Sequence, residues 1–75
     1  MRITYDPEAD ALYIAFRKDP SVAETHQVND DISVDLDEQG RIVGLEVLFA
    51  SKQIPRSELF SLVFEDLAQT TSASP

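Results

Sequence analysis

The 75-residue sequence lacks cysteine altogether and contains only one histidine and two glycines. Without cysteine there can be no disulfide, no thiol nucleophile and no zinc–thiolate site. A single imidazole excludes a metal site built on two histidines of one chain. Two glycines leave no glycine-rich loop that could hold a phosphate. These absences remove most compact catalytic motifs, and we expect no cofactor, no metal and no catalytic residue of a known type.

The sequence also lacks a long apolar run. None approaches the roughly 18 residues that cross a bilayer, and charged residues interrupt the N-terminal segment that a secretory signal would occupy. A chain of this length buries only about 60% of the surface that its unfolded form exposes. Because no disulfide supports that small core, oligomerisation is the common remedy. We therefore expect a cytoplasmic protein that forms a homodimer or a higher homo-oligomer.

Positive charge is scarce, with six basic against 14 acidic residues and a formal net charge of -8. Binding to nucleic acid or to anionic membranes depends on a basic surface, so we expect neither as a partner. The acidity has two readings that the composition leaves open. It could serve solubility alone, or it could complement a basic protein partner.

Five short segments alternate apolar and polar residues with the period of two that is typical of β-strands. They cover residues 1–5, 11–17, 22–28, 31–36 and 41–49. The polar segment 22–28 belongs near the edge of a sheet. Gly40 can take the left-handed conformation that closes a hairpin between the last two strands. Gly44, inside the last strand, indicates a bulge, a bend or a close approach by another backbone.

The spacing changes to about 3.6 after Pro55, which predicts a helix over residues 55–68. The apolar arc of this helix covers about 200°, more than one core requires. Its own sheet would fill one side, and the same helix of a second copy could fill the other. Phe60, Leu62 and Phe64 are the candidate interface residues. Residues 69–75 are small and polar and predict a disordered tail.

Together these segments predict a single α+β domain over residues 1–68. The expected fold is an antiparallel β-meander of about five short strands, with one C-terminal helix packed on the apolar face. The predicted core consists of Ile3, Leu12, Ile14, Phe16, Ile32, Val34, Leu36, Val43, Leu45, Val47, Leu59, Val63 and Leu67.

Three carboxylates, Asp6, Glu8 and Asp10, occupy alternate positions of the first turn and could share a calcium or magnesium ion. They could equally bond the turn backbone or face solvent. Asp35, Asp37 and Glu38 before Gly40 resemble part of a calcium loop, although a hairpin turn also explains them. The residues alone do not choose between these readings.

Glu46 and His26 are the other candidates for chemistry. Glu46 lies in an apolar strand and must reach water or find a cation such as Arg41 or Lys52. His26 lies on the polar strand, where it could be a solvated neighbour of Glu24 or a base. No nucleophile-elbow pattern accompanies the available serines.

Two blocks of the sequence carry a family resemblance. The first runs from Tyr5 through Asp6-Pro7-Glu8-Ala9-Asp10-Ala11-Leu12-Tyr13 to Ile14. The second runs from Ile32 to Leu48 and ends with Ala50-Ser51. Over about residues 3–54 the chain resembles the bacterial and archaeal family called domain of unknown function 2283. The resemblance supports the fold and implies no activity, cofactor or catalytic residue. It is consistent with a self-assembling module or with the smaller half of a two-protein pair.

Two functions from different classes therefore follow from the sequence. The favoured one is a non-catalytic interaction module that self-associates and binds a basic protein partner. The alternative is a small hydrolase or metal-dependent enzyme that uses the clustered carboxylates, or Glu46 with His26 across a subunit boundary. Whether the acids converge on one pocket distinguishes the two.

Overall fold

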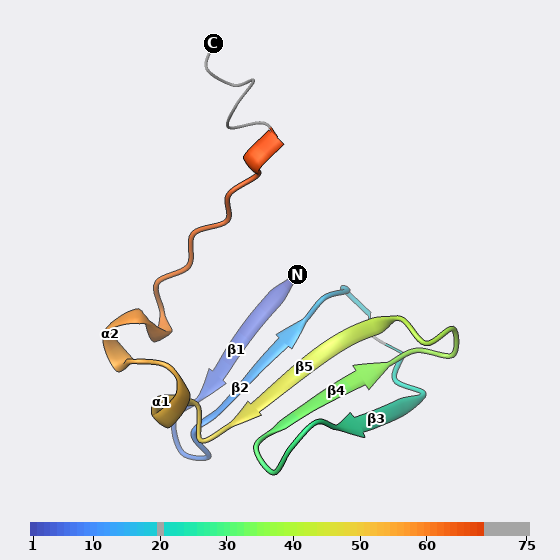
Figure 1. Ribbon diagram of the computed structural model, residues 1–75, viewed down its shortest axis with the longest axis horizontal. Helices are drawn as coiled ribbons and strands as arrows, with labels where there is room; N and C mark the ends of the chain where they lie inside the picture. The colour runs from blue at the N-terminus through green and yellow to red at the C-terminus, as the bar shows by residue number, and fades with distance from the viewer. Residues whose placement is uncertain (20, 69–75) are drawn as a thin grey trace.

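The computed structural model of the chain describes residues 1–19 and 21–68, which form a five-stranded antiparallel sheet with two short helices (Figure 1). The strands are β1 (Arg2–Asp6), β2 (Ala11–Ala15), β3 (Glu24–Gln27), β4 (Ile32–Leu36) and β5 (Ile42–Leu48). The helices α1 (Ala50–Gln53) and α2 (Arg56–Leu59) follow β5 and lie together at one end of the sheet. The predicted α+β class is confirmed.

The strand order is β1-β2-β5-β4-β3, which differs from the predicted meander at one connection. A full meander would place β3 in the centre beside β2, whereas β3 lies at the far edge beside β4 (Figure 1). All four residues of β3 are exposed, so a central position would bury polar side chains without partners. The apolar β5 takes the centre instead, with Val43 fully buried.

The hairpin between β4 and β5 forms as predicted. Gly40 has a φ of 79°, in the left-handed region that favours glycine, and its N–H donates to the carbonyl of Asp37 at 3.0 Å. The register shifts between Asp35 and Leu36, next to this turn. The local sequence therefore contained enough information to define this hairpin.

One row of cross-strand partners on the apolar face is covered by the helices. It runs across β1, β2, β5 and β4 through Tyr5, Leu12, Val47 and Ile32. Ala50 is fully buried against this row, and Ile54 and Leu59 pack on it. We call this row the covered rung.

The next row on the same face is left largely open. It contains Ile3, Ile14, Leu45 and Val34, and we call it the open rung. Ile3 is 40% exposed and the other three are half-buried. Phe16, which continues the alternation of β2, is also 40% exposed. Of the predicted core, only Leu12, Val43 and Val47 are less than 10% exposed, because the helices are too short to cover the whole face.

The predicted helix over residues 55–68 is wrong beyond α2. Residues 61–66 belong to neither a helix nor a strand. Helices shorter than about 12 residues are marginal in water unless packing supports them, and phenylalanine, serine and valine are weak helix formers. Nothing among the described residues packs on this segment with enough area to supply that support.

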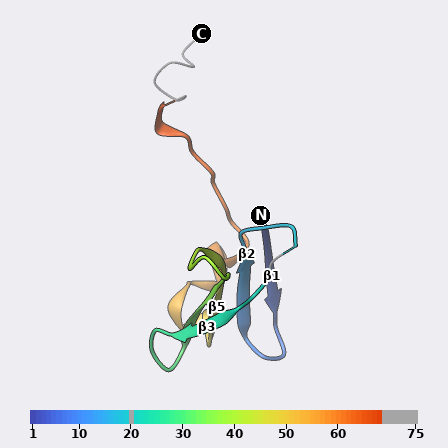
Figure 2. The same ribbon diagram turned by 90° about the vertical axis from the view of Figure 1, so that its right-hand side faces the viewer.

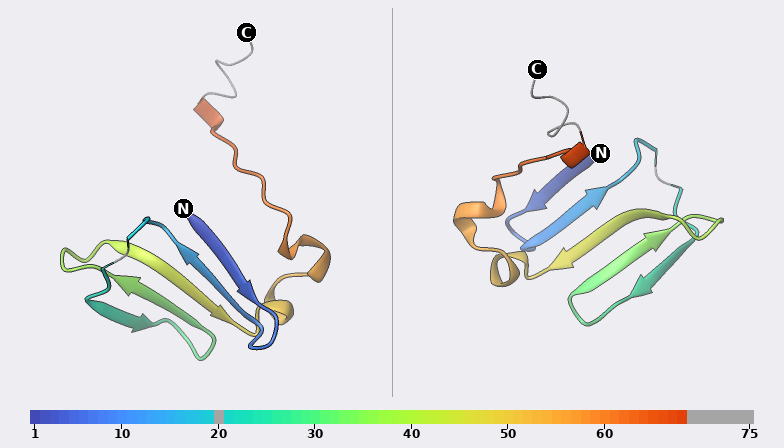
Figure 3. Two further views of the ribbon diagram at one scale, coloured as in Figure 1. Left: turned by 180° about the vertical axis from the view of Figure 1, so that it is seen from behind. Right: turned by 45° about the horizontal axis from the view of Figure 1, so that its top comes forward.

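We call residues 60–67 the apolar arm. Its large side chains are exposed to 69–81%, and they are Phe60, Leu62, Val63, Phe64 and Leu67. The core positions predicted at Val63 and Leu67 are therefore wrong. Figures 1 and 2 show the arm leading away from the sheet, and both views of Figure 3 agree. The predicted tail at residues 69–75 lies outside the described residues.

Candidate functional site

Asp10 joins the first turn to the start of α1. Its backbone carbonyl accepts the N–H of Ala50 at 3.0 Å, its Oδ1 accepts the N–H of Ser51 at 3.0 Å, and its Oδ2 accepts the Ser51 hydroxyl at 2.7 Å. The Tyr5 hydroxyl donates to Oδ1 at 2.6 Å. We call these four residues the Asp10 clamp. The clamp holds the β1–β2 turn and α1 in fixed relation to the covered rung.

The electrostatics of the Asp10 clamp suit a structural tie. Hydrogen bonds from the Ser51 hydroxyl and then from Tyr5 hold the pKa of Asp10 below its ordinary value. The bond to Asp10 in turn raises the pKa of the Tyr5 hydroxyl. A general base works best when its pKa lies near the working pH, and a lowered pKa moves Asp10 away from that range. The carboxylate is therefore a good acceptor and a poor base.

The three carboxylates of the first turn do not converge. Asp6 Oδ1 accepts the N–H groups of Glu8 at 3.0 Å and Ala9 at 3.3 Å, which is the local turn bonding considered above. Asp10 faces Ser51, and the Glu8 side chain is exposed. Within residues 1–19 and 21–68, no group of three histidine or acidic residues could hold a metal ion.

A hydrogen-bond network crosses the opposite, polar face of the sheet. The Tyr13 hydroxyl on β2 donates to Asp35 Oδ2 on β4 at 2.7 Å, and the Thr25 hydroxyl on β3 donates to Asp35 Oδ1 at 2.7 Å. Between β2 and β4, the Tyr13 ring lies across Gly44 of β5. A Cβ at Gly44 would be 1.9 Å from the Tyr13 hydroxyl oxygen and 2.5 Å from Cζ. Gly44 therefore permits the predicted close approach, although a side chain makes it rather than a backbone.

This network changes the chemistry of Tyr13. The hydrogen bond to Asp35, together with burial and the charge of Asp35, raises the pKa of Tyr13 to about 12. A phenol with so high a pKa stays protonated and continues to donate. The hydrogen bonds of the network link three strands, β2, β3 and β4, across β5, without creating a nucleophile.

Glu46 lies on the polar face, where it is opposite Tyr13 and Ser33 in the strand register. It is half-buried, and no hydrogen bond or ion pair joins it to any part of the chain that the structure describes. The cations proposed for it lie elsewhere: Arg41 bonds the β4–β5 turn, and the Lys52 ammonium lies 5.1 Å from the centre of the Phe49 ring. Of the two alternatives for Glu46, reaching water or pairing with a cation, the pairing with Arg41 or Lys52 does not form, and the half-buried side chain keeps access to solvent.

His26 pairs with Glu24 on the exposed edge strand, with Nε2 and Oε1 2.9 Å apart. In the register it is opposite Val34, on the apolar face. Glu46 belongs to the polar face, so the sheet separates the two groups that the enzyme hypothesis combines. One chain does not bring them together.

Asp37, 8% exposed, is the most heavily bonded carboxylate. Its Oδ1 accepts the N–H groups of Gln39 and Arg41, each at 2.9 Å. Its Oδ2 accepts Arg41 Nε at 2.9 Å and Arg17 Nη1 at 3.0 Å. The Arg41 N–H, then the Arg41 side chain and the Gln39 N–H, lower the pKa of Asp37 to about 2. Two arginines and a hairpin turn thus occupy the carboxylate that the calcium-loop hypothesis would have used.

Acid is expected to weaken the fold through Asp37. Its pKa falls on folding from 3.8 to about 2, so its stabilising effect is complete above about pH 4 and is lost as the pH falls towards 2. The urea midpoint of the wild type, followed by circular dichroism, should fall across this window. At neutral pH, Asp37→Asn should be less stable than the wild type, with a Tm that is roughly 10 °C lower. Its urea midpoint should fall less than that of the wild type as the pH is lowered.

The control for this experiment is Glu38→Gln, an exposed carboxylate of the same turn. It should retain the wild-type acid response, because no bond in the described chain depends on its charge. Asp10 also has a lowered pKa and will leave some acid response in Asp37→Asn. Equal losses in Asp37→Asn and the wild type between about pH 4 and pH 2 would contradict the assignment.

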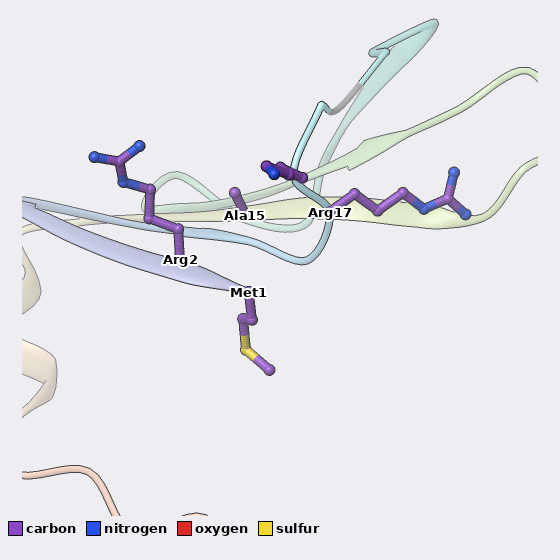
Figure 4. A pocket seen from close by; sticks show the side chains of 5 residues that line it. Met1, Arg2, Ala15 and Arg17 are labelled. Atoms are coloured by element: carbon purple, nitrogen blue, oxygen red, sulfur yellow. The ribbon is translucent and has the colours of Figure 1, made fainter.

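Basic residues gather at the end of the sheet opposite the helices. A cavity of about 240 Å³ there is lined by Met1, Arg2, Ala15, Arg17 and Lys18. Figure 4 shows the Arg2 and Arg17 side chains pointing in opposite directions, so the cations do not converge on one small anion. They form instead a broad basic edge, by which we mean Arg2, Arg17 and Lys18.

The predicted interface residues lie on the apolar arm rather than on a helix. Phe60, Leu62 and Phe64 are 75%, 69% and 80% exposed. The Phe60 ring meets Tyr5 edge to face, with centroids 5.7 Å apart and planes at 82°. This contact fixes the base of the arm beside β1, whereas Leu62, Val63 and Phe64 beyond it are 69–81% exposed. No described helix is long and apolar enough to span a membrane.

The sequence did not predict the Asp10 clamp or the polar network. No local pattern links Ser51 to Asp10 or Asp35 to Tyr13, because the partners are far apart in the sequence.

A comparison with curated proteins finds no match, and neither does a comparison with solved structures. The family model described as "Protein of unknown function (DUF2283)" matches residues 2–51, which include the whole sheet and both halves of the Asp10 clamp. The match ends before α2 and the apolar arm. The chain therefore belongs to the DUF2283 family.

Proposed function

We propose that this protein is a non-catalytic interaction module of the cytoplasm that associates with itself and binds a basic protein partner. The observation that carries the proposal is the exposure of two apolar surfaces, the apolar arm and the open rung that the helices do not cover. Soluble monomers rarely expose large contiguous apolar surface, and such surface usually marks a binding site. The cysteine-free composition supports a reducing compartment.

The use of the polar side chains supports a non-catalytic role. Asp10, Asp35 and Asp37 each accept several internal hydrogen bonds that tie separate elements together. The two pKa values that are lowered, those of Asp10 and Asp37, make these groups weaker bases. A carboxylate that has been recruited for catalysis would be expected to shift in the opposite direction.

A basic partner is supported by the net charge of -8 and by where the acids lie. Asp6, Glu8 and Asp30 are exposed in the turns at the helix end of the sheet, away from the basic edge. An acidic surface attracts and orients a basic protein, and this attraction raises the rate of association. The predicted partner contact is therefore the acidic turn end.

Light scattering and co-purification test the proposal together. The chain has a mass of 8.4 kDa, and we expect a species of at least twice that mass at micromolar concentrations. Tagged protein recovered from its native extract should carry a basic protein in stoichiometric amount. A high salt concentration should release this partner, because salt screens the electrostatic contact. An Asp6→Asn, Glu8→Gln, Asp30→Asn variant should lose the partner and keep its mass. A monomer at every concentration, carrying no basic protein, would refute the proposal.

A further inference from the structure

The receiving surface is an apolar row that ends in positive charge. Ile3 and Ile14 of the open rung are followed, towards one end of the sheet, by Phe16 and then by the basic edge. Ile3 and Phe16 are each 40% exposed. Four of the six basic residues of the chain, Arg41 included, line the two cavities at this end. Arg17 and Arg41 pair with Asp37 of the hairpin, which leaves Arg2 and Lys18 as the cations at this end that neither the Asp10 clamp nor the hairpin uses among the described residues.

The apolar arm carries the matching pattern. Leu62, Val63 and Phe64 are followed directly by Glu65 and Asp66. In an extended segment, successive side chains point to opposite sides, so Leu62 and Phe64 share one side and Val63 takes the other. The arm thus offers two large apolar side chains on one side, and acidic residues follow them directly along the chain.

We infer that the arm of one copy docks beside β1 of a second copy, reciprocally, with Leu62 and Phe64 on the apolar face against Ile3 of the open rung and with Glu65 on the opposite face near Arg2 of the basic edge. This inference rests on the proposed self-association and names its contact. The base of the arm lies beside the edge strand β1, which has a neighbour on one side only. An extended arm adds there as a further strand, a recurring mode of peptide recognition.

The area is sufficient for a stable dimer. The exposed parts of Phe60, Leu62 and Phe64 amount to about 400 Å² for one arm, given the size of aromatic side chains. Two arms and the two surfaces that receive them would bury about 1,600 Å², the size of a standard specific interface. The second copy is favoured as the occupant because both halves of the complementary pattern, apolar and charged, lie on the same chain.

The first test is Phe64→Asp in the full chain. Light scattering at about 100 μM should give half the wild-type mass. The dissociation constant of the dimer should rise at least 100-fold, because a charge would be buried on the open rung. The substitution lies in an exposed arm outside the family-matched residues, so the circular dichroism spectrum and Tm of the sheet should not change. Val63→Asp is the matched control. It changes a side chain that is equally exposed but lies on the other side of the extended arm, and it should leave the mass unchanged.

Complementation between variants tests the reciprocal geometry. Ile3→Asp blocks the receiving surface and keeps the arm, whereas Phe64→Asp blocks the arm and keeps the surface. Each alone should be monomeric, and their mixture should give a one-to-one dimer held by a single arm. In addition, Glu65→Lys should weaken the dimer about tenfold, and adding Arg2→Glu should restore it.

The outcomes separate this inference from the proposed function. A wild-type dimer that survives Phe64→Asp, or a mixture that does not form a dimer, would overturn arm exchange while leaving self-association intact. A wild-type monomer, with its arm folded back on its own sheet or free, would overturn both. Loss of mass in Val63→Asp as well as in Phe64→Asp would contradict the one-sided contact.

Discussion

Gly44→Ala is expected to lower the stability of the sheet by about 2 kcal/mol, or roughly 10 °C in Tm. The added methyl would lie 1.9 Å from the Tyr13 hydroxyl oxygen and 2.5 Å from Cζ, much closer than van der Waals contact. To make room, Tyr13 must leave Asp35, and the link between β2 and β4 is lost. Thermal and urea unfolding followed by circular dichroism would measure the effect.

A double-mutant cycle identifies the cause. Tyr13→Ala removes the ring that occupies the space above Gly44, so the Gly44→Ala, Tyr13→Ala protein should be more stable than the sum of the single effects predicts. The expected coupling is at least about 1 kcal/mol, in the range found for residues in contact. Tyr13→Phe, which loses the hydroxyl alone, should relieve Gly44→Ala only in part, because Cζ remains. Additive effects in all pairs would mean that the Tyr13 ring does not lie across β5.

The strands could be predicted because alternation is a local property. Residues Asp31 to Leu36 alternate without exception, and the turn to β5 contains a glycine at the position that needs positive φ. The edge position of β3 also followed from its polar residues. The strand order did not follow, because placing β5 beside β2 depends on pairings between residues 29 to 37 positions apart, such as Leu12 with Val47.

The helix prediction failed because the same residues satisfy two periods. A spacing of 3.6 groups Phe60 with Phe64 on one face, and a period of two groups Leu62 with Phe64 on one side. Apolar content alone does not separate these readings for a short segment. The three interface candidates are the same in both, and their exposure supports the proposal that another chain covers them.

The side-chain ties were hidden for a different reason. Tyr5 and Tyr13 lie on adjacent strands, yet Tyr5 is opposite Leu12 on the apolar face and Tyr13 lies on the polar face. Successive side chains of a strand point to opposite faces of the sheet, and a shift of the pairing register by one residue moves every side chain of the strand to the other face. Register is set by the whole sheet, so the hydrogen bonds that depend on it cannot be inferred from either tyrosine alone.

Asp10→Ala is expected to lower Tm by roughly 10–15 °C, the other large effect. The substitution removes the acceptor for the Tyr5 hydroxyl, the Ser51 N–H and the Ser51 hydroxyl, contacts that span up to 41 residues of sequence. It also places alanine at a φ of 51°, a conformation that aspartate and asparagine tolerate better. Because α1 begins at this contact, the helices should separate from the covered rung.

Two variants distinguish the clamp from ordinary turn chemistry. Asp10→Asn can still accept from Tyr5 and the Ser51 N–H and can donate to the Ser51 hydroxyl, so it should retain most of the stability. Asp6→Ala removes only the two local bonds to Glu8 and Ala9 and should cost less than half as much as Asp10→Ala. Hydrogen exchange at the Ala50 amide, which donates to the Asp10 carbonyl, should accelerate in Asp10→Ala and in neither of the other variants. Equal destabilisation by Asp6→Ala and Asp10→Ala, with equal protection of the Ala50 amide, would mean that Asp10 acts only within its turn. In that case the packing of Ala50, Ile54 and Leu59 on the covered rung would alone hold the helices in place.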